Sequence, residues 1–289
     1  MSERFIGNQI ILRFLGNFVK KKYQTQNMKK LIILIFLFSL KIHAQKPVTA
    51  ILGAFSDEVK LLEDSLQNKQ IVNLKGIRFL TGELRGRSVV VALTGVGKVN
   101  AAMTTTMLLM NWQPQQLIFT GIAGGVNQDI QPGDIVMAKF SIQHDFGKID
   151  STGMVLWQTF NPTQKARNPL YFPADSVLLM KAQKVSGRTK YKTVLGRNVK
   201  VITGIVATGD VFVNSNQKVE QLRNQLKADA AEMEGAAVAQ VCYQLKIPCL
   251  IIRSISDNAN AKAHLDMNTF ASIAAYNSAS LVLGILEEL

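Results

Sequence analysis

The chain of 289 residues is 47% hydrophobic and 18% charged, the composition of an ordinary globular protein that can bury a sizeable core. Its formal net charge of +13 resembles that of nucleic-acid-binding proteins, but residues 1–44 contribute eight of the 33 basic residues and one of the 20 acidic ones. The remaining excess is dispersed and is not interleaved with aromatic residues, so we expect a solvated surface and no nucleic-acid partner.

The N-terminal region has the layout of a secretory signal peptide. Met28 and two lysines precede the apolar run 31–40, and Ala44 provides a small residue at a cut site before Gln45. The run is about half of the ~20 residues that a membrane-spanning helix needs. We therefore expect translation to begin at Met28, with residues 1–27 lying upstream of the true start and disordered. Residues 28–44 would be removed, and 45–289 would be exported to the periplasm or the medium without stable membrane insertion.

Beyond the signal, the hydrophobic pattern predicts strands that alternate with helices. We expect strands at 48–53, 88–93, 117–120, 134–144, 199–207 and 249–254, with a hairpin over 71–84. Helices are expected at 99–110, 170–185, 217–226, 233–245 and 267–286, and another follows Ser56, which would cap it. This alternation indicates an α/β fold: a single domain with a central mixed, largely parallel twisted sheet flanked by helices. Ligands of such sheets bind beyond the carboxyl ends of the strands.

Two glycine-rich runs interrupt this pattern. The run 95–100 lacks the third glycine of a dinucleotide fingerprint, and it also lacks the first glycine and the hydroxyl residue of a phosphate-binding P-loop. It predicts a tight turn. The run 121–125 follows a strand, and it either forms a plain turn or presents backbone N–H groups to a ligand.

The sequence gives no sign of a metal or an organic cofactor. No cluster of Cys and His residues has metal-ligand spacing, so we expect no metal site and no cofactor. Cys242 lies in an apolar helical pattern and Cys249 in a strand, which predicts two buried free thiols rather than a disulfide.

Within the stretch 206–258, the three runs 208–214, 231–237 and 253–257 together hold four carboxylates, one aromatic residue and one arginine, at predicted strand ends and a helix start. That set suits cleavage of a bond between ribose and a purine. Positive charge develops on the sugar and negative charge on the base as this bond breaks. Carboxylates should therefore face the sugar, and a proton donor should face the base.

Seven segments, in this order along the chain, resemble the signatures of 5'-methylthioadenosine/S-adenosylhomocysteine nucleosidases. They are GAFSDEV (53–59), TGVGKVNAA (94–102), TGIAGG (120–125), PGDIV (132–136), GDVF (209–212), EMEGA (232–236) and RSISD (253–257). Each is weak alone, but seven in order are specific, and the similarity extends from about residue 48 to the C-terminus. The wider superfamily also contains purine and uridine phosphorylases.

The resemblance implies three catalytic residues. Glu58 matches the carboxylate that positions and deprotonates the attacking water, and it lies in the first turn of a helix, where the dipole favours its ionised form. Asp257 matches the acid that serves N7 of the purine, which requires a carboxyl group with a raised pKa. Arg253 matches a group that orients water or a carboxylate, and Glu232 would form an internal ion pair.

The resemblance also implies a set of substrate-binding residues. Glu234 would accept hydrogen bonds from both ribose hydroxyls, Phe212 would stack on the purine, and Ser256 would orient the catalytic aspartate. The remaining members are expected to line the pocket or to offer their backbone: Val213, Met233, Ala123 and Gly124. Phe55 and Phe270 are candidates for the apolar pocket of the 5' substituent.

These roles predict hydrolysis of the N-glycosidic bond of 5'-methylthioadenosine, S-adenosylhomocysteine or a related purine nucleoside, with release of the free base. Two alternatives stay open: a phosphate-dependent purine nucleoside phosphorylase, and a nucleoside-binding protein without turnover. A phosphorylase needs cationic groups for phosphate, usually arginines, whereas the loop 53–58 has none and Glu58 would repel the anion.

The chain departs from the usual family pattern in three ways, and these leave the preferred substrate open. It carries an export signal, it has the unusual segment 146–172, and Ile122 stands where many relatives have a small polar residue. The substrate could therefore be adenosine, inosine or another purine nucleoside. The family commonly forms homodimers in which a neighbour closes the pocket, so a homodimer is expected here too.

Overall fold

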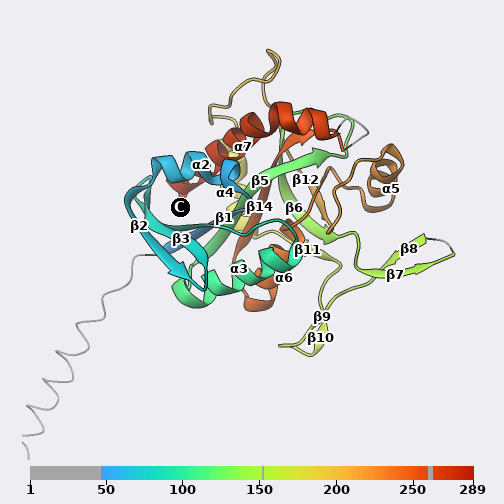
Figure 1. Cartoon of the computed structure of the whole chain (residues 1–289), viewed down its shortest axis with the longest axis horizontal. Coiled ribbons are helices and arrows are strands. Elements are labelled where there is room, and N and C mark those ends of the chain that lie inside the picture. Colours follow the sequence, from blue (N-terminus) through green and yellow to red (C-terminus); the bar gives the residue numbers. More distant parts are fainter. Residues whose placement is uncertain (1–46, 152, 260–262) are drawn as a thin grey trace, which may run out of the picture. The chain divides into compact units, whose positions relative to one another are not determined.

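Strands and helices alternate along the chain around one mixed sheet (Figure 1). The structure, a computed structural model, describes residues 47–151, 153–259 and 263–289, with only the backbone of 264 and 265. The expected start at Met28, the expected signal peptide 28–44 and the expected mature N-terminus at Gln45 lie outside these residues.

The main sheet contains ten strands. They are β1 (Val48–Gly53), β2 (Gln67–Leu74), β3 (Ile77–Leu84), β4 (Arg87–Leu93), β5 (Gln116–Gly125), β6 (Ile135–Gln143), β11 (Tyr171–Pro173), β12 (Val201–Thr208), β13 (Ala230–Glu232) and β14 (Cys249–Asp257). The helices are α2 (Ser56–Ser65), α3 (Lys98–Trp112), α4 (Ser176–Ser186), α5 (Asn216–Leu226), α6 (Gly235–Leu245) and α7 (Ala263–Glu288). The predicted α/β fold with a central mixed sheet and flanking helices is confirmed.

The sheet closes on itself at one end. Its strands follow the order β11-β6-β12-β13-β5-β1-β4-β3-β2, and β14 pairs with both β5 and β6. The strands β6, β12, β13, β5 and β14 therefore form a closed ring, with parallel pairing of β14 to β5 and antiparallel pairing of β14 to β6. This closure brings the ends of β5, β12, β13 and β14 around one point, where a ligand can contact all of them.

Helices cover both faces of the sheet. The helices α2, α4 and α7 pack on one face and α3 and α6 on the other (Figure 1). Successive strand residues point to opposite faces, so Ile51 and Ile118 join the core under α7, while Leu52 and Phe119 join the core on the α3 and α6 side. Burial of both faces explains why these strands read as continuous apolar runs.

Helix α7 combines length with low polarity. Its portion from Asp266 to Glu288 is the one described helix that is long and apolar enough to cross a membrane. In this domain it packs against β5, β14, α2 and α4, and its residues Ala275, Ala279, Val282 and Leu286 are buried. It therefore serves as a core helix of the domain.

Two predictions differ from the structure: the helix expected at 170–185 and the cap expected at Ser56. The expected helix 170–185 is instead strand β11 followed by α4, because Pro173 cannot donate to a helix and disfavours the helical conformation before it. Asp175 caps α4 by accepting a hydrogen bond from the Leu178 amide at 2.9 Å. The expected cap at Ser56 is also wrong, because α2 begins at Ser56 itself and the carboxylate of Glu58 accepts from the preceding amides of Ala54 and Phe55.

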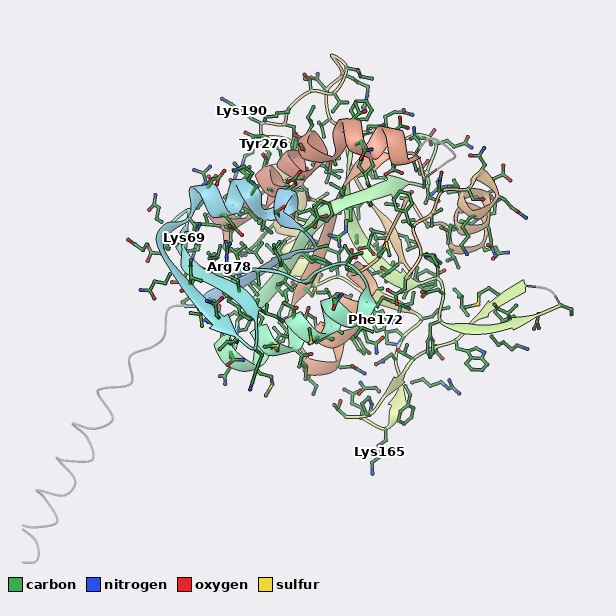
Figure 2. All side chains as sticks on the ribbon, viewed as in Figure 1. Lys69, Arg78, Lys165, Phe172, Lys190 and Tyr276 are labelled. Atoms are coloured by element: carbon green, nitrogen blue, oxygen red, sulfur yellow. The ribbon has the colours of Figure 1, made fainter. Side chains whose placement is uncertain are left out.

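The segment 146–172 forms two small hairpins at the edge of the domain. The hairpin β7 (Gly147–Asp150) with β8 (Gly153–Leu156) and the hairpin β9 (Phe160–Asn161) with β10 (Ala166–Arg167) project away from the sheet (Figure 1). Lys165 points outward from the end of the second hairpin (Figure 2). Large apolar side chains on this segment are exposed, including Ile149, Trp157 and Phe160.

The two thiols lie in the core, as predicted. Cys242 of α6 and Cys249 of β14 are both free and buried. The neighbouring Cys249 thiol and burial raise the pKa of Cys242 well above its ordinary value. Both side chains therefore act as small apolar packing groups.

Candidate functional site

A cavity of about 410 Å³ lies at the carboxyl ends of the central strands. Its lining contains eight of the ten residues predicted for the site: Glu58, Ala123, Gly124, Phe212, Met233, Glu234, Ser256 and Asp257. They come from α2, β5, β14 and the segments that follow β12 and β13, so elements distant in sequence converge on one space. The volume is within the range of small-molecule sites.

Glu58 is buried at the bottom of this cavity in a cradle of backbone amides. Its Oε1 accepts from the Ile122 amide at 2.8 Å, and its Oε2 accepts from the Ala54 amide at 2.5 Å and the Phe55 amide at 3.4 Å. Burial raises the pKa of Glu58, although Arg253 and the three amides act in the opposite direction. A carboxylate held in this way is fixed in position and is a stronger base than an exposed one.

The glycine run 121–125 is part of β5 and not a turn. The amide of Ile122 donates to Glu58, so this N–H group supports a catalytic candidate and is not free for a ligand. A Cβ atom on Gly121 would lie 2.4 Å from Oε1 of Glu58 and 3.1 Å from a guanidinium nitrogen of Arg253. Glycine is therefore required at this position because the carboxylate and the guanidinium group approach the strand backbone closely.

Arg253 lies beneath the cavity and does not line it. Its Nε and Nη2 donate to Oε2 of Glu232 at 3.1 and 2.7 Å, and the guanidinium group stacks on the ring of Phe119 at 4.0 Å. The internal ion pair predicted for Glu232 is thus present, and both partners are buried. In this arrangement Arg253 orients a carboxylate, which is one of the two roles that the sequence left open.

Glu234 projects into the cavity from the start of α6. Its Oε1 accepts from the Gly97 amide at 2.8 Å, and Gly97 adopts a φ of +95°, a backbone conformation that favours glycine. Burial, reinforced by the negative charge of Glu232, raises the pKa of Glu234 to about 8. The turn 95–97 therefore holds a cavity carboxylate and not a phosphate.

Asp257 ends β14 on another side of the lining. Its Oδ2 accepts from the Ser256 hydroxyl at 2.8 Å, and its Oδ1 accepts from the Ala259 amide at 2.7 Å. Burial raises the pKa of Asp257 despite these two hydrogen bonds, and the charge of Asp266 adds to the increase. The group can consequently retain a proton at a pH at which an exposed aspartate is ionised.

The apolar part of the cavity divides into two regions. Phe212 lies in the lining and is 45% exposed, so its ring is accessible to a planar ligand. At another part, Phe55, Ile122 and Met267 line the cavity and pack together with alanines of α7. Phe55 is thus placed as expected for an apolar substituent.

Three predicted residues do not line the cavity: Arg253, as described above, Val213 and Phe270. The side chain of Val213 packs into a separate apolar cluster with Ile142 and Ala231. Sequence reasoning missed other lining residues, namely Ala54, Val96, Ala231 and Met267. All four are small or apolar, and such residues carry no chemical signal outside the fold that places them.

The arrangement combines four acids with distinct surroundings. Three cavity carboxyl groups have raised pKa values, while the only buried guanidinium or ammonium group in the described part of the chain, Arg253, is bonded to the fourth acid, Glu232. Such a site favours a ligand on which positive charge develops, and it supplies both a proton donor and a proton acceptor. Within the same described ranges no group of three or more His, Cys, Asp or Glu residues could hold a metal ion.

Comparisons with known proteins agree with this chemistry. The sequence model of the phosphorylase superfamily matches residues 48–287. A 5'-methylthioadenosine/S-adenosylhomocysteine nucleosidase of Psychromonas ingrahamii is 40% identical over 240 residues, which cover 83% of this chain and 98% of the relative.

Two solved structures are similar in fold and sequence. One is a nucleosidase of the same name from Colwellia psychrerythraea in complex with adenine, with 34% identity and a TM-score of 0.75 over 85% of this chain and 96% of the other. The second is a futalosine hydrolase of Helicobacter pylori, with 30% identity and a TM-score of 0.74 over 85% of this chain and 100% of the other.

The close approach at Gly121 leads to a first prediction. We expect Gly121→Ala to destabilise the protein by about 1–3 kcal/mol, because the added methyl group must displace Glu58 or the strand. Chemical denaturation measures this difference. Gly187→Ala is the matched control, since a Cβ there meets nothing within 4 Å and φ is −74°. Equal stability of the two variants would show that the cradle is loose.

The raised pKa of Glu234 leads to a second prediction, on stability. Its pKa rises from an ordinary 4.5 to about 8 on folding, so between these pH values the unfolded chain releases a proton that the folded protein keeps. Stability therefore falls as pH rises through this window. We expect Glu234→Gln to remove this loss of stability. Its free energy of unfolding should exceed that of the parent protein by about 2–4 kcal/mol at pH 9 and should differ little at pH 4.5.

Thermal unfolding from pH 4.5 to pH 9 tests this, with the exposed Glu220→Gln as control. A difference between Glu234→Gln and the parent protein that stays constant across this pH range would argue against a raised pKa at Glu234.

Proposed function

Because the chain belongs to the phosphorylase superfamily and, within it, to the 5'-methylthioadenosine/S-adenosylhomocysteine nucleosidases, we propose that it is an N-glycosidase. It hydrolyses the bond between ribose and base in 5'-methylthioadenosine, S-adenosylhomocysteine or a related purine nucleoside and releases the free base. The observation that carries this proposal is that Glu58 and Asp257, from α2 and β14, line the same cavity.

Each acid has a surrounding that suits one step of the reaction. Asp257 holds a proton because burial raises its pKa, and it passes that proton to N7 as the bond to the base breaks. Glu58, fixed by three amides, accepts a proton from the attacking water. The oxygen of that water bonds to the anomeric carbon as the electron pair of the broken bond goes to the base, so the products are the neutral free base, with the proton from Asp257 at N7, and the free sugar.

The cavity also has groups that hold the substrate. The Glu234 carboxyl group forms hydrogen bonds with the ribose hydroxyls. Its raised pKa leaves it largely protonated in the free protein at neutral pH, and the positive charge that develops on the sugar favours its ionised form, which stabilises the oxocarbenium-like transition state. The ring of Phe212 stacks on the purine, while Ala123, Gly124 and Met233 complete the walls. Binding of the sugar cation relieves the repulsion between the acids, so these groups bind the transition state more tightly than the substrate.

Water, and not phosphate, is the nucleophile in this proposal. Among the described residues that line the cavity, none is an arginine, a lysine or a histidine. The guanidinium group of Arg253 is already bonded to Glu232, and the amides that could hold an anion are bonded to Glu58. A phosphate dianion would meet uncompensated negative charge, so a phosphorylase is disfavoured.

The 5' substituent would lie against the apolar region of Phe55, Ile122 and Met267. An alkylthio group gains from burial there, whereas a charged group would lose hydration without finding a partner. This supports 5'-methylthioadenosine as the substrate in preference to nucleosides with a polar 5' end.

We also propose a homodimer that uses one face of α3. Val99, Met103 and Met110 are exposed on this helix, and the equally exposed Val96 lines the cavity. An exposed apolar stripe beside a site is typical of a surface that a partner covers. Sedimentation of the parent protein and of Val99→Glu would test this, and a monomeric parent protein would contradict it.

Export is the proposed destination because of the signal-like segment 28–44. Recovery of the protein from the periplasm or medium with an N-terminus near Gln45 would support it. Recovery from the cytoplasm with residues 28–44 intact would contradict it.

A third prediction tests the reaction itself. We expect the parent protein to release adenine from 5'-methylthioadenosine, and both Glu58→Gln and Asp257→Asn to lower kcat by about 10²–10⁴-fold, since each removes one partner of general acid–base catalysis. Each variant keeps the size of the side chain, so binding of the substrate should persist. Chromatographic assay of free adenine measures the rate.

Two controls separate the alternatives. A rate that rises in proportion to added phosphate would identify a phosphorylase. Tight nucleoside binding by the parent protein without any release of base would identify a binding protein and would overturn the enzymatic proposal.

A further inference from the structure

Three residues outside the cavity form a closed triangle of hydrogen bonds, called here the polar triangle: Lys98, Asp145 and Asp210. The amide of Lys98 donates to Oδ1 of Asp210 at 2.7 Å, and the amide of Asp210 donates to Oδ2 of Asp145 at 2.7 Å. The ammonium group of Lys98 closes the triangle by donating to Oδ1 of Asp145 at 2.6 Å. Both oxygens of Asp145 are therefore engaged.

The polar triangle joins three separate parts of the sheet. Lys98 starts α3 after β4, Asp145 follows β6, and Asp210 follows β12. The side chains of Lys98 and Asp145 are less than a quarter exposed. Burial alone would raise the pKa of Asp145, but the bonds from Lys98 and from the Asp210 amide outweigh it and lower that pKa. The carboxylate is thus held ionised between two donors, unlike a solvated surface ion pair.

The polar triangle adjoins two residues of the cavity, Glu234 and Phe212. Gly97, directly before Lys98, donates its amide to Glu234, and Phe212 lies two residues after Asp210. The ammonium group of Lys98 also donates to Gln143 at 3.1 Å, whose side-chain amide donates to Gln240 of α6. The helix α6 begins immediately after Glu234. The triangle consequently connects the residue that faces the ribose with the residue that faces the base.

We propose that Asp145 is a positioning residue, which acts through Lys98 and Asp210 to hold Phe212 against the base while the Gly97 turn holds Glu234. The inference rests on the proposed glycosidase function and deepens it. Without the Asp145 carboxylate, the bonds from the Lys98 amide to Asp210 and from the Gly209 amide to the Glu232 carbonyl remain. The segment that carries Phe212 nevertheless loses one of its hydrogen bonds to the rest of the domain, the one from the Asp210 amide, and Lys98 loses its anionic partner. The base then has a less ordered surface on which to stack.

The variants Asp145→Ala and Asp145→Asn test this role together with Phe212→Ala. We expect Asp145→Ala to raise both KM and the dissociation constant of adenine about tenfold, with a smaller change in kcat, because stacking contributes to the ground state and the transition state alike. Asp145→Asn keeps one acceptor oxygen and should fall between the parent protein and Asp145→Ala. Calorimetry with adenine measures binding without relying on catalysis.

The double variant Asp145→Ala/Phe212→Ala separates positioning from general stability. If Asp145 acts through Phe212, the double variant should bind adenine no more than about twofold more weakly than Phe212→Ala alone. Asp134→Ala is the matched control, since Asp134 also accepts from a cation, Arg197 at 2.8 Å, and from a backbone amide, but away from the cavity. It should lower Tm and leave adenine binding unchanged.

The outcomes distinguish this proposal from the proposed function. A parent protein that binds adenine but releases none from any nucleoside refutes the glycosidase, and the binding experiment still tests Asp145. The positioning role would be overturned if Asp145→Ala bound adenine as tightly as the parent protein. It would also be overturned if the loss of adenine affinity in the double variant equalled the product of the losses in the two single variants. The glycosidase proposal would stand in either case.

Discussion

The site depends on how one buried guanidinium group is shared among buried glutamates. Arg253 interacts with Glu58, Glu232 and Glu234, but its short hydrogen bonds go to Glu232. Its position is fixed by the ring of Phe119 on one face and by carbonyl oxygens of β5 and β14. Loss of either partner of this buried pair would leave an uncompensated charge, which costs about 3–5 kcal/mol in proteins. The central strands are thus packed around an electrostatic contact as well as around apolar side chains.

The carboxyl groups that lack a cationic partner give the cavity its chemistry. Glu58 and Glu234 are supported mainly by backbone amides, and burial raises the pKa of both. Burial of these carboxyl groups without a cationic partner lowers the stability of the free protein. Active sites commonly reduce stability in this way. A sugar that becomes cationic in the transition state favours the ionised form of these groups and is stabilised by their negative charge. A substrate on which no positive charge has developed is stabilised less by these carboxyl groups. The site therefore binds the transition state more tightly than the substrate.

The alternation of apolar strands and helices predicted the α/β fold, whereas most of the cavity residues were implied by the resemblance of seven short segments to one family. The sequence places Asp257 just after the predicted strand 249–254, and Glu58 and Glu234 at the starts of predicted helices. In such a fold the strand ends and the helix starts that follow them meet at one edge of the sheet. The sequence did not predict the closed ring of strands, because β13 is only three residues long and its pairing with β5 is antiparallel. The glycine run 121–125 was ambiguous for a related reason: only the structure shows that a carboxylate from α2 occupies the space beside the strand. The expected cap at Ser56 failed because that same carboxylate supplies the bonds to the amides.

The different surroundings of Glu232 and Glu234, two residues apart, explain how one short segment provides a structural acid and a functional one. Glu232 ends β13, where its carboxylate accepts from the amides of Glu234 and Gly235, from the Thr208 hydroxyl and from Arg253. The amides of Glu234 and Gly235 at the start of α6 and the Arg253 guanidinium group are therefore committed to it. Glu234 lies just beyond the strand, where its carboxyl group accepts a hydrogen bond from the Gly97 amide and faces the cavity that a substrate can fill. Exchange of the two environments would require α6 to start elsewhere. The register between β13 and α6 thus determines which glutamate lacks a cationic partner and faces the cavity.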